Sequence, residues 1–422
     1  MKKILKNPYI LSIISKSFGV VIGLLFTIFQ ARYLGPGIKG QVATVNSIIS
    51  ITSIIFGFGV YHAYPYYRRN TNSDILPIFL KIALLMLIIY STISAIIISL
   101  FHFSSKVYAV IMITPFITYD GIVSYITLIE VPNKKSMTDI GVLFLELLLL
   151  VTFWFFAKPS FIIGVLIISS KSVAKAILFT FWWRKKIFIQ SESLVLWIPR
   201  IVKFGFFPML SLLMTTLNYR LDVIMLNGKV ADAAIGVYSI GVLLSERIWL
   251  IPDALKGIMA SKITKGKDAK ETAFVIRISN TICFFIAICI VLLGKEFLNY
   301  VFGSTYEGAY QVTLILLVGV FSMIYYKLIA SYNIVMGKQL ISFVFLCIGV
   351  VINVFANLVL IPLMGIYGAG LSSVISYSLC SVFFIVYFCS STKISFFSML
   401  FINRDDYSRI KTVIFRKERK LE

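Results

Sequence analysis

The stretch FIIGVLIISSKSVAKAILFTFWW, residues 161–183, decides the class of fold. It is long enough to cross the hydrocarbon core of a membrane as a helix, which takes about 20 apolar residues. Two lysines, Lys171 and Lys175, lie inside it four residues apart and therefore share one helical face. A cation near the centre of a bilayer costs about 3 kcal/mol on insertion scales. The stretch therefore predicts a membrane-spanning helix whose two lysines face water or an anionic partner.

Similar apolar segments recur along the whole chain of 422 residues, which is 59% hydrophobic and has a mean hydropathy of +0.93. Soluble domains contain only about 45–50% apolar residues. Twelve spans are predicted, at residues 8–31, 42–62, 78–101, 107–130, 140–157, 161–183, 204–226, 233–256, 273–293, 309–332, 341–362 and 366–389. We therefore expect an all-α polytopic membrane protein.

The formal net charge of +22 reflects the predicted topology rather than a nucleic-acid partner. With the N-terminus placed in the cytoplasm, 28 of the 40 Lys and Arg residues fall in cytoplasmic segments and six fall on the opposite side. This asymmetry follows the positive-inside rule and predicts that both termini are cytoplasmic. The basic tail is expected to contact anionic membrane lipids as well.

The chain divides into two predicted halves at a basic connection. Residues 1–186 are predicted to form one six-helix bundle, residues 187–203 a cytoplasmic connecting loop, and residues 204–389 a second six-helix bundle. Residues 390–422 form a basic cytoplasmic tail. Two halves of the same topology are what transporters use to move one bundle against the other. This organisation predicts a central cleft between the bundles.

Several cations lie inside the predicted spans, where they are costly. We predict that five of them provide a cationic, substrate-binding cavity: Lys16, Lys171, Lys175, Arg220 and Arg247. A sixth, Lys327, lies near the predicted cytoplasmic end of its span, and we interpret it as an interfacial side chain. Because like charges one helical turn apart repel, we favour a phosphate or a carboxylate beside Lys171 and Lys175. Pairing with acids on neighbouring helices is the alternative.

Polar and small residues of the first span share one face, and they are Ser12, Lys16, Gly19, Gly23, Thr27 and Gln30. Glycines four residues apart often pack helices closely. Lys16 and Gln30 instead favour a face that lines a wet cavity.

Acidic residues within the spans have two interpretations. Asp120, Asp222 and Glu246 either balance the cations or take up H⁺ or Na⁺ during transport, and Glu146 is a further acid within a span with the same two interpretations. No catalytic residues, metal site or cofactor is expected beyond such a coupling ion. The two histidines, His62 and His102, are too far apart to suggest a metal motif. Gly35, Gly37 and Gly40 match a dinucleotide-binding pattern without a preceding strand, so we interpret them as a turn.

Several motifs resemble the polysaccharide-exporter branch of the multidrug/oligosaccharidyl-lipid/polysaccharide flippase superfamily, specifically its O-antigen flippases. The matching stretches are Ala31-Arg32-Tyr33-Leu34-Gly35-Pro36 with Gly40, Arg220-Leu221-Asp222, Gly236-Val237-Tyr238-Ser239 with Glu246, Met336-Gly337-Lys338, and Gly365-Ile366-Tyr367-Gly368-Ala369. The sequence departs from the family where Ala260, instead of a proline, precedes Ser261. Lys171 and Lys175 correspond to no motif of the family.

The resemblance implies a flippase that moves an undecaprenyl-pyrophosphate-linked oligosaccharide to the outer leaflet of a bacterial inner membrane. The cargo would be an O-antigen, capsule or exopolysaccharide repeat unit, carried by alternating access between two six-helix bundles around a central cleft. An ion gradient or the membrane potential would drive it, and other polysaccharide-assembly proteins are implied partners.

Three alternatives remain open. A drug-cation exporter of the same fold would be expected to have an acidic interior, whereas the central charges here are five cations and four acids. A flippase for a cell-wall precursor lipid is a closer relative of the favoured function. A membrane polymerase or ligase would typically carry a large outer loop, but the longest one here, residues 294–308, is short and lacks histidine.

Overall fold

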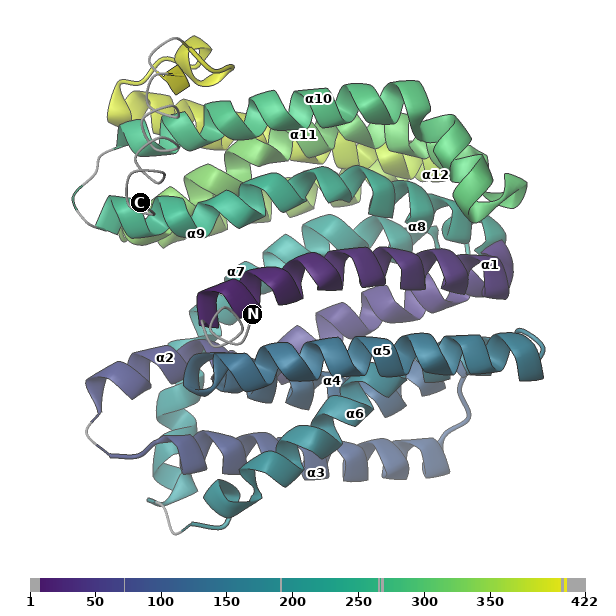
Figure 1. The fold of residues 1–422 in the computed structure, drawn as a ribbon, viewed down its shortest axis with the longest axis vertical. Helices are drawn as coiled ribbons and strands as arrows, with labels where there is room; N and C mark the ends of the chain where they lie inside the picture. Colours follow the sequence, from purple (N-terminus) through teal and green to yellow (C-terminus); the bar gives the residue numbers. More distant parts are fainter. Residues whose placement is uncertain are drawn as a thin grey trace, which may run out of the picture. The chain divides into compact units, whose positions relative to one another are not determined.

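The computed structural model describes residues 8–71, 73–189, 192–264, 266, 269–403 and 406–407, with side chains from residue 19 onward. These residues are almost entirely α-helical (Figure 1). The α-helices are α1 (Pro8–Phe56), α2 (Val60–Asn70), α3 (Leu76–Leu100), α4 (Ser105–Glu130), α5 (Pro132–Phe156), α6 (Phe161–Ile187), α7 (Leu194–Leu226), α8 (Asp232–Glu246), α9 (Leu250–Thr264), α10 (Ala269–Phe302), α11 (Gly308–Val335) and α12 (Gln339–Thr392). Short 3₁₀ helices are η1 (Arg247–Trp249), η2 (Ser304–Tyr306) and η3 (Phe397–Met399).

Ten helical stretches among the described residues are long and apolar enough to cross a membrane. Two of these stretches, α1 with α2 and α12, exceed 50 residues. Helix α1 bends at Gly35 and helix α12 at Gly365, and each arm has about 20 residues or more, enough to span by itself. The prediction of an all-α polytopic membrane protein is therefore confirmed. The central cleft between the halves stays a prediction.

The predicted outer loop between the first two spans is wrong, because the helix continues through it with a single bend. Gly35 adopts a left-handed φ of 69°, which a glycine reaches without steric cost. Pro36 follows at once, and a proline is well suited to the first position of a new helical arm. The chain therefore changes direction at one residue, Gly35, and not over a ten-residue loop. This agrees with the interpretation of the glycine motif as a turn.

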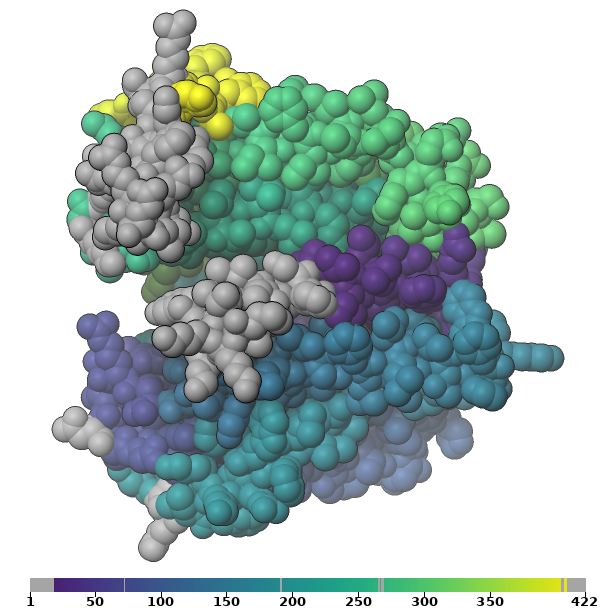
Figure 2. Space-filling model, in the orientation of Figure 1, coloured from purple at the N-terminus to yellow at the C-terminus, as the bar shows by residue number. Residues whose placement is uncertain are grey.

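The chain forms two compact units, residues 1–236 and 237–422, each described here by itself. In the first unit, α1 packs against α4, α5, α6 and α7, and α4 packs against α3, α5 and α6. A large apolar core lies among α2, α3, α4, α6 and α7 and includes Tyr64, Phe79, Tyr119, Phe179 and Trp197. Other large apolar side chains remain exposed, as a lipid-facing surface requires. Figure 2 shows side chains of α5 at the surface of this unit.

Helix α7 starts within the segment that was predicted as a connecting loop. Residues 194–198 read LVLWI, and Trp197 is buried in the core of the first unit. This apolar contact explains why the helix forms here, ten residues before the predicted span. The domain boundaries themselves stay a prediction.

Two glycines bring helices α1 and α8 into close contact within the first unit. A Cβ atom placed on Gly40 would lie 1.7 Å from the carbonyl oxygen of Asp232, and one on Gly236 would lie 2.0 Å from that of Pro36. Nearby, the Lys106 ammonium donates to Asn227 Oδ1 at 2.9 Å and to Asp232 Oδ1 at 2.7 Å. Helix packing therefore accounts for a glycine at position 40, and nucleotide binding is not required to explain it.

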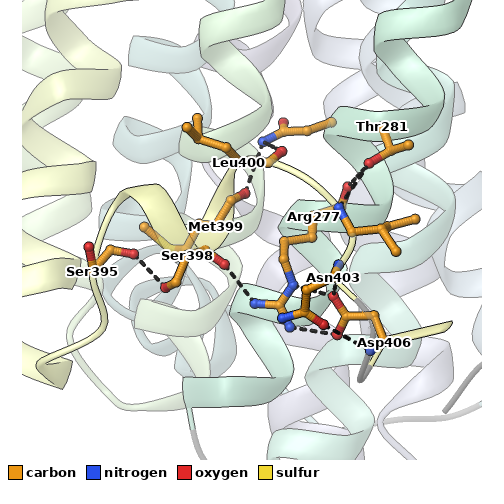
Figure 3. A network of polar contacts seen from close by, with 10 residues as sticks. Arg277, Thr281, Ser395, Ser398, Met399, Leu400, Asn403 and Asp406 are labelled. Atoms are coloured by element: carbon orange, nitrogen blue, oxygen red, sulfur yellow. Dashed lines mark hydrogen bonds and ion pairs between the residues drawn. The ribbon is translucent and has the colours of Figure 1, made fainter. Parts of the chain in front are cut away.

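In the second unit, α11 packs against α9, α10 and α12. The chain leaves α12 at Lys393 and turns back onto α10, where Arg277 and Asp406 form a two-pronged ion pair at 2.5 and 2.7 Å (Figure 3). Arg277 also donates to the carbonyl oxygen of Ser398, and Met399 is fully buried. The first part of the predicted tail is therefore docked on the second unit.

Candidate functional site

Six charged residues gather where α4, α5 and α6 meet in the first unit. We call this set the α4–α6 charge cluster, and it consists of Asp120, Lys135, Asp139, Glu146, Lys171 and Lys175. The Lys175 ammonium lies 2.9 Å from Asp139 Oδ1 and 3.8 Å from Asp120 Oδ2. Asp139 is also paired with Lys135, one turn earlier on α5. One lysine thus shares two carboxylates, and one carboxylate shares two lysines.

The cluster follows from helical periodicity. Lys135, Asp139 and Glu146 are spaced by four and seven residues and therefore share one face of α5. Lys171 and Lys175 likewise share one face of α6, and the three helices contact one another pairwise. Asp120 on α4 completes the set, and its Oδ1 accepts a hydrogen bond from the Ser124 hydroxyl at 2.6 Å.

Glu146 and Lys171 are the least satisfied members of the cluster. The Glu146 side chain is buried, with only 5% of the residue exposed. Lys171, Lys175 and Asp120 act on it electrostatically, yet within the described part of the chain it accepts no hydrogen bond and has no cation within 4 Å. Lys171 is half-buried and makes no ion pair with any described residue. Two opposite charges therefore face each other without touching.

The alternative interpretation of the lysine pair holds for Lys175, because this side chain pairs with acids on neighbouring helices. The prediction missed Asp139 and Lys135, which it placed outside the spans. Helix α5 begins eight residues before the predicted span, with Pro132 at its first turn. A proline followed by Lys135 and Asp139 at a spacing of four was the signal that could have extended the helix to them.

Arg220 lies in a polar pocket of about 370 Å³ within the first unit. The pocket is lined by Asn46, Ile49, Ser50, Ser53, Ile54, Ile117, Thr216, Tyr219 and Arg220, from α1, α4 and α7. Ile117 is about one helical turn from Asp120, so α4 contributes a residue to both the pocket and the charge cluster. The pocket offers a guanidinium and several hydroxyl groups, a combination that suits a phosphate or a sugar.

Asp222 does not line this pocket, although it is only two residues from Arg220. It is 2% exposed, and its Oδ1 accepts a hydrogen bond from the backbone N–H of Val223 at 2.8 Å. Residues two positions apart on a helix point in different directions, which is why Arg220 lines the pocket and Asp222 does not.

Glu246 and Arg247 belong to the second unit, at the point where α8 passes into the 3₁₀ helix η1. A short 3₁₀ stretch between two α-helices often marks a hinge. Lys327 lies close by: its ammonium is 3.1 Å from Asp253 Oδ2 and 4.7 Å from the centre of the Trp249 ring. An acid and an aromatic ring thus hold the Lys327 side chain at 12% exposure, and its position at the membrane interface stays a prediction.

The side chain of Lys16 lies outside the described residues, so its predicted role stays a prediction. The arm of α1 that carries it packs against α5, where a Cβ on Gly19 would meet Leu143 at 3.8 Å. A Cβ on Gly23 would meet nothing within 4 Å. These two glycines are therefore not sites of close helix packing among the described residues, and the wet cavity along this face stays a prediction.

Metal-binding residues do not gather in the parts of the chain that the structure describes. No group of three or more His, Cys, Asp or Glu side chains there could hold a metal ion.

The fold and these internal charges define an all-α polytopic membrane protein with ionic sites inside its helical units. No protein-family model matches the sequence, and no curated protein matches it in sequence. Three solved structures share its fold over nearly the whole chain. The lipid II flippase MurJ in an inward closed conformation is 16% identical, with a TM-score of 0.70, over 93% of this chain and 89% of that chain.

An inward-facing multidrug resistance MATE family transporter of the MOP superfamily is 14% identical, with a TM-score of 0.62, over 90% of this chain and 98% of that chain. A MOP superfamily transporter from Pyrococcus furiosus, for which the reverse polarity of the binding pocket suggests a different function, is 12% identical. Its TM-score is 0.54, over 93% of this chain and 98% of that chain. The chain therefore has the fold that these flippase and transporter structures share.

Proposed function

We propose that this chain is a flippase for a lipid-linked oligosaccharide, most specifically an undecaprenyl-pyrophosphate-linked O-antigen, capsule or exopolysaccharide repeat unit. The cargo would pass from the cytoplasmic to the outer leaflet of a bacterial inner membrane by alternating access. Two findings support this proposal: the fold shared with a lipid II flippase, and the motifs that resemble polysaccharide exporters.

The observation that carries the proposal is that the α4–α6 charge cluster and the Arg220 pocket share helix α4, through Asp120 and Ile117. A pyrophosphate needs cations, and Lys171 and Arg220 belong to these two sites of the first unit. The glycan needs hydrogen bonds, and the pocket presents the hydroxyl groups of Ser50, Ser53 and Tyr219. Lys171 contacts the pyrophosphate, and the serines and the tyrosine contact the sugar.

The remaining predicted residues take supporting roles in this proposal. Lys175 is held by Asp139 and Asp120 and supports the cationic site from the same face of α6 as Lys171. Lys16 and Arg247 are further proposed contributors to the cationic cavity. Asp120, Asp222 and Glu246 balance these cations or exchange H⁺ or Na⁺. The charge asymmetry of the connecting segments supports cytoplasmic termini.

A second candidate is a drug-cation exporter of the same fold. Glu146 favours it, because a buried carboxyl group with no described hydrogen-bond partner could receive a cationic drug. A MATE family transporter also shares the fold. Fold similarity at these identities does not separate the two functions, so the sign of the charge on the transported molecule is the property to test.

Complementation tests the proposal directly. The chain is expressed in a bacterium that lacks its own O-antigen flippase, and surface polysaccharide is measured together with accumulated lipid-linked intermediate. We expect surface glycan to be restored by the wild-type chain and lost in the Lys171→Ala/Lys175→Ala variant, with the protein still inserted in the membrane.

The matched control removes two lysines that are exposed at helix ends, Lys158→Ala/Lys295→Ala, and should export normally. Unimpaired export by the Lys171→Ala/Lys175→Ala variant would contradict the assignment of the cationic site. Resistance to toxic cations without glycan export would support the drug exporter instead.

A further inference from the structure

We infer that binding of an anionic cargo at the α4–α6 charge cluster is coupled to the uptake of one proton by Glu146. This inference rests on the proposed function, because it requires an anion to enter beside Lys171. It singles out Glu146 among the four acids that are predicted either to balance the cations or to take up H⁺ or Na⁺, which are Asp120, Glu146, Asp222 and Glu246.

The first step is the charge balance of the cluster. Its three lysines and three carboxylates cancel formally when all six are ionised. A pyrophosphate that enters would add at least one full negative charge among groups that are largely buried. Excess charge in such surroundings is costly, because the desolvation penalty of a buried ion is several kcal/mol. Protonation of one carboxylate removes most of that excess.

The second step identifies the carboxylate that takes the proton. Asp139 is held by two lysines, and Asp120 accepts a hydrogen bond from Ser124 and lies 3.8 Å from Lys175. Both anions are therefore stabilised where they are. Glu146 is buried and has neither an ion pair nor a hydrogen bond from a described residue. Among these three, the buried carboxylate that lacks a partner within the described residues is the least stable anion, so it is the one that protonates.

The third step considers every helix that packs on α5 around Glu146, namely α1, α4 and α6. Helix α6 presents Lys171 and Lys175, and α4 presents Asp120. Helix α1 carries Arg32 and Lys39 near its bend, and neither acts on Glu146; Lys16 is its remaining charge, with a side chain outside the described residues. Among the described cations, Lys171 is thus the one that would leave its interaction with Glu146 and bind the anionic cargo.

The coupling works in both directions. When the anion engages Lys171, Glu146 loses its main electrostatic stabilisation and takes up a proton; when Glu146 is already protonated, Lys171 is released for the anion. Linkage requires the two effects to be equal in size. Where Glu146 is ionised in the free protein and protonated in the complex, anion affinity rises by about tenfold for each unit that the pH falls.

Calorimetry on the purified full-length chain in lipid nanodiscs tests this coupling, with farnesyl pyrophosphate as the anionic probe. Titrations in two buffers of different ionisation enthalpy give the number of protons taken up for each anion bound. We expect about one more proton for the wild-type chain than for Glu146→Gln at the same pH, so protonation of the probe itself cancels. The Glu146→Gln variant should still bind farnesyl pyrophosphate, but its affinity should lack the part of the pH dependence that comes from protonation of Glu146.

Two variants serve as matched controls. Glu130→Gln removes a carboxylate that pairs with Arg68 at the end of α4, and it should leave proton uptake unchanged. Glu146→Asp keeps a titratable group and should restore part of the uptake, which separates a proton-binding role from a loss of fold.

The outcomes distinguish the inference from the function on which it rests. If wild type and Glu146→Gln bind the probe with equal proton uptake, the inference is overturned and the anion site stands. If the wild-type chain binds no probe, the proposed function fails first. A wild-type chain that binds the probe with no proton uptake at all also overturns the inference, whatever the variants do.

Discussion

The Arg277–Asp406 pair and the α4–α6 charge cluster are both ionic and both contain buried carboxylates, yet they are built in opposite ways. Arg277 meets Asp406 through two parallel contacts, and the remaining capacity of Asp406 is taken by the backbone N–H of Asn403 (Figure 3). In the cluster, Lys175 and Asp139 each have two partners, and Glu146 and Lys171 have no close described partner. A closed pair fixes a segment of chain, whereas an open cluster can exchange its partners for a ligand.

The largest expected effect is on glycan export, and it comes from a substitution in the α4–α6 charge cluster. Lys171→Ala should lower glycan export by at least about thirtyfold, because losing one partner of a buried charged contact costs about 2–5 kcal/mol. The free energy of unfolding should change by less than about 1 kcal/mol, since the structure gives Lys171 no ion pair with a described residue. Export assays and denaturant titration of the same preparation measure both quantities. Equal losses of stability and export would make the cluster structural, like the Arg277 pair.

Arg277→Ala should show the reverse pattern. It leaves the Asp406 carboxylate buried at 5% side-chain exposure without its guanidinium, and breaking a buried pair from one side costs about 3–5 kcal/mol. Thermal unfolding in detergent should report this loss, while export for each folded molecule stays at the wild-type level. Arg277→Lys should recover only part of the stability, because an ammonium cannot make the two parallel contacts. A full loss of export with unchanged stability would contradict the comparison.

Lys135→Gln should have an intermediate effect, because Asp139 keeps Lys175 as a partner at 2.9 Å. We expect a several-fold decrease in export, of the size that follows from about 1 kcal/mol. Lys134→Gln is the control, since Lys134 lies over the ring of Trp182, 5.8 Å from its centre, and not on Asp139. Equal effects of the two substitutions would mean that Lys135 acts only through the charge at the membrane surface.

The smallest effect is expected at an exposed pair. Lys186 donates to Asp74 at 3.0 Å and lowers the pKa of that carboxyl group, although both side chains are more than 40% exposed. Because the folded pKa lies below the unfolded value of about 3.9, the pair stabilises the fold above that pH. That contribution is lost as the pH falls through the folded pKa. Asp74→Asn should cost at most about 1 kcal/mol at pH 7 and nothing in strong acid. Denaturant titrations at the two pH values check this.

The sequence predicts the membrane spans well because the thickness of the bilayer fixes their length. Each predicted span coincides with helix among the described residues, from residues 42–62 in α1 and α2 to residues 366–389 in α12. At the junction of the first two spans, the sequence does not distinguish a loop from a bend in a continuous helix, because Gly35 and Pro36 are compatible with both. The difference lies in the backbone torsion of one residue.

The candidate site was predictable in its cations but not in their partners. Lys171 and Lys175 stand out because apolar residues surround them in the chain. Asp139 gives no such signal, since it pairs with Lys175 only through the early start of α5 and the packing of α5 on α6. Lys327 shows the same limit, because its partner Asp253 lies on another helix.

The close contact between Gly40 and Gly236 has a consequence for how the sequence can vary. Each glycine faces the backbone of the other's helix, and a backbone oxygen occupies the place of each missing side chain, at 1.7 and 2.0 Å. A smaller neighbour cannot compensate for a substitution, since the obstacle is main chain and not a side chain. In a saturation mutagenesis library, both positions should therefore reject even alanine, and no second-site change of side chain within the contact should rescue either one.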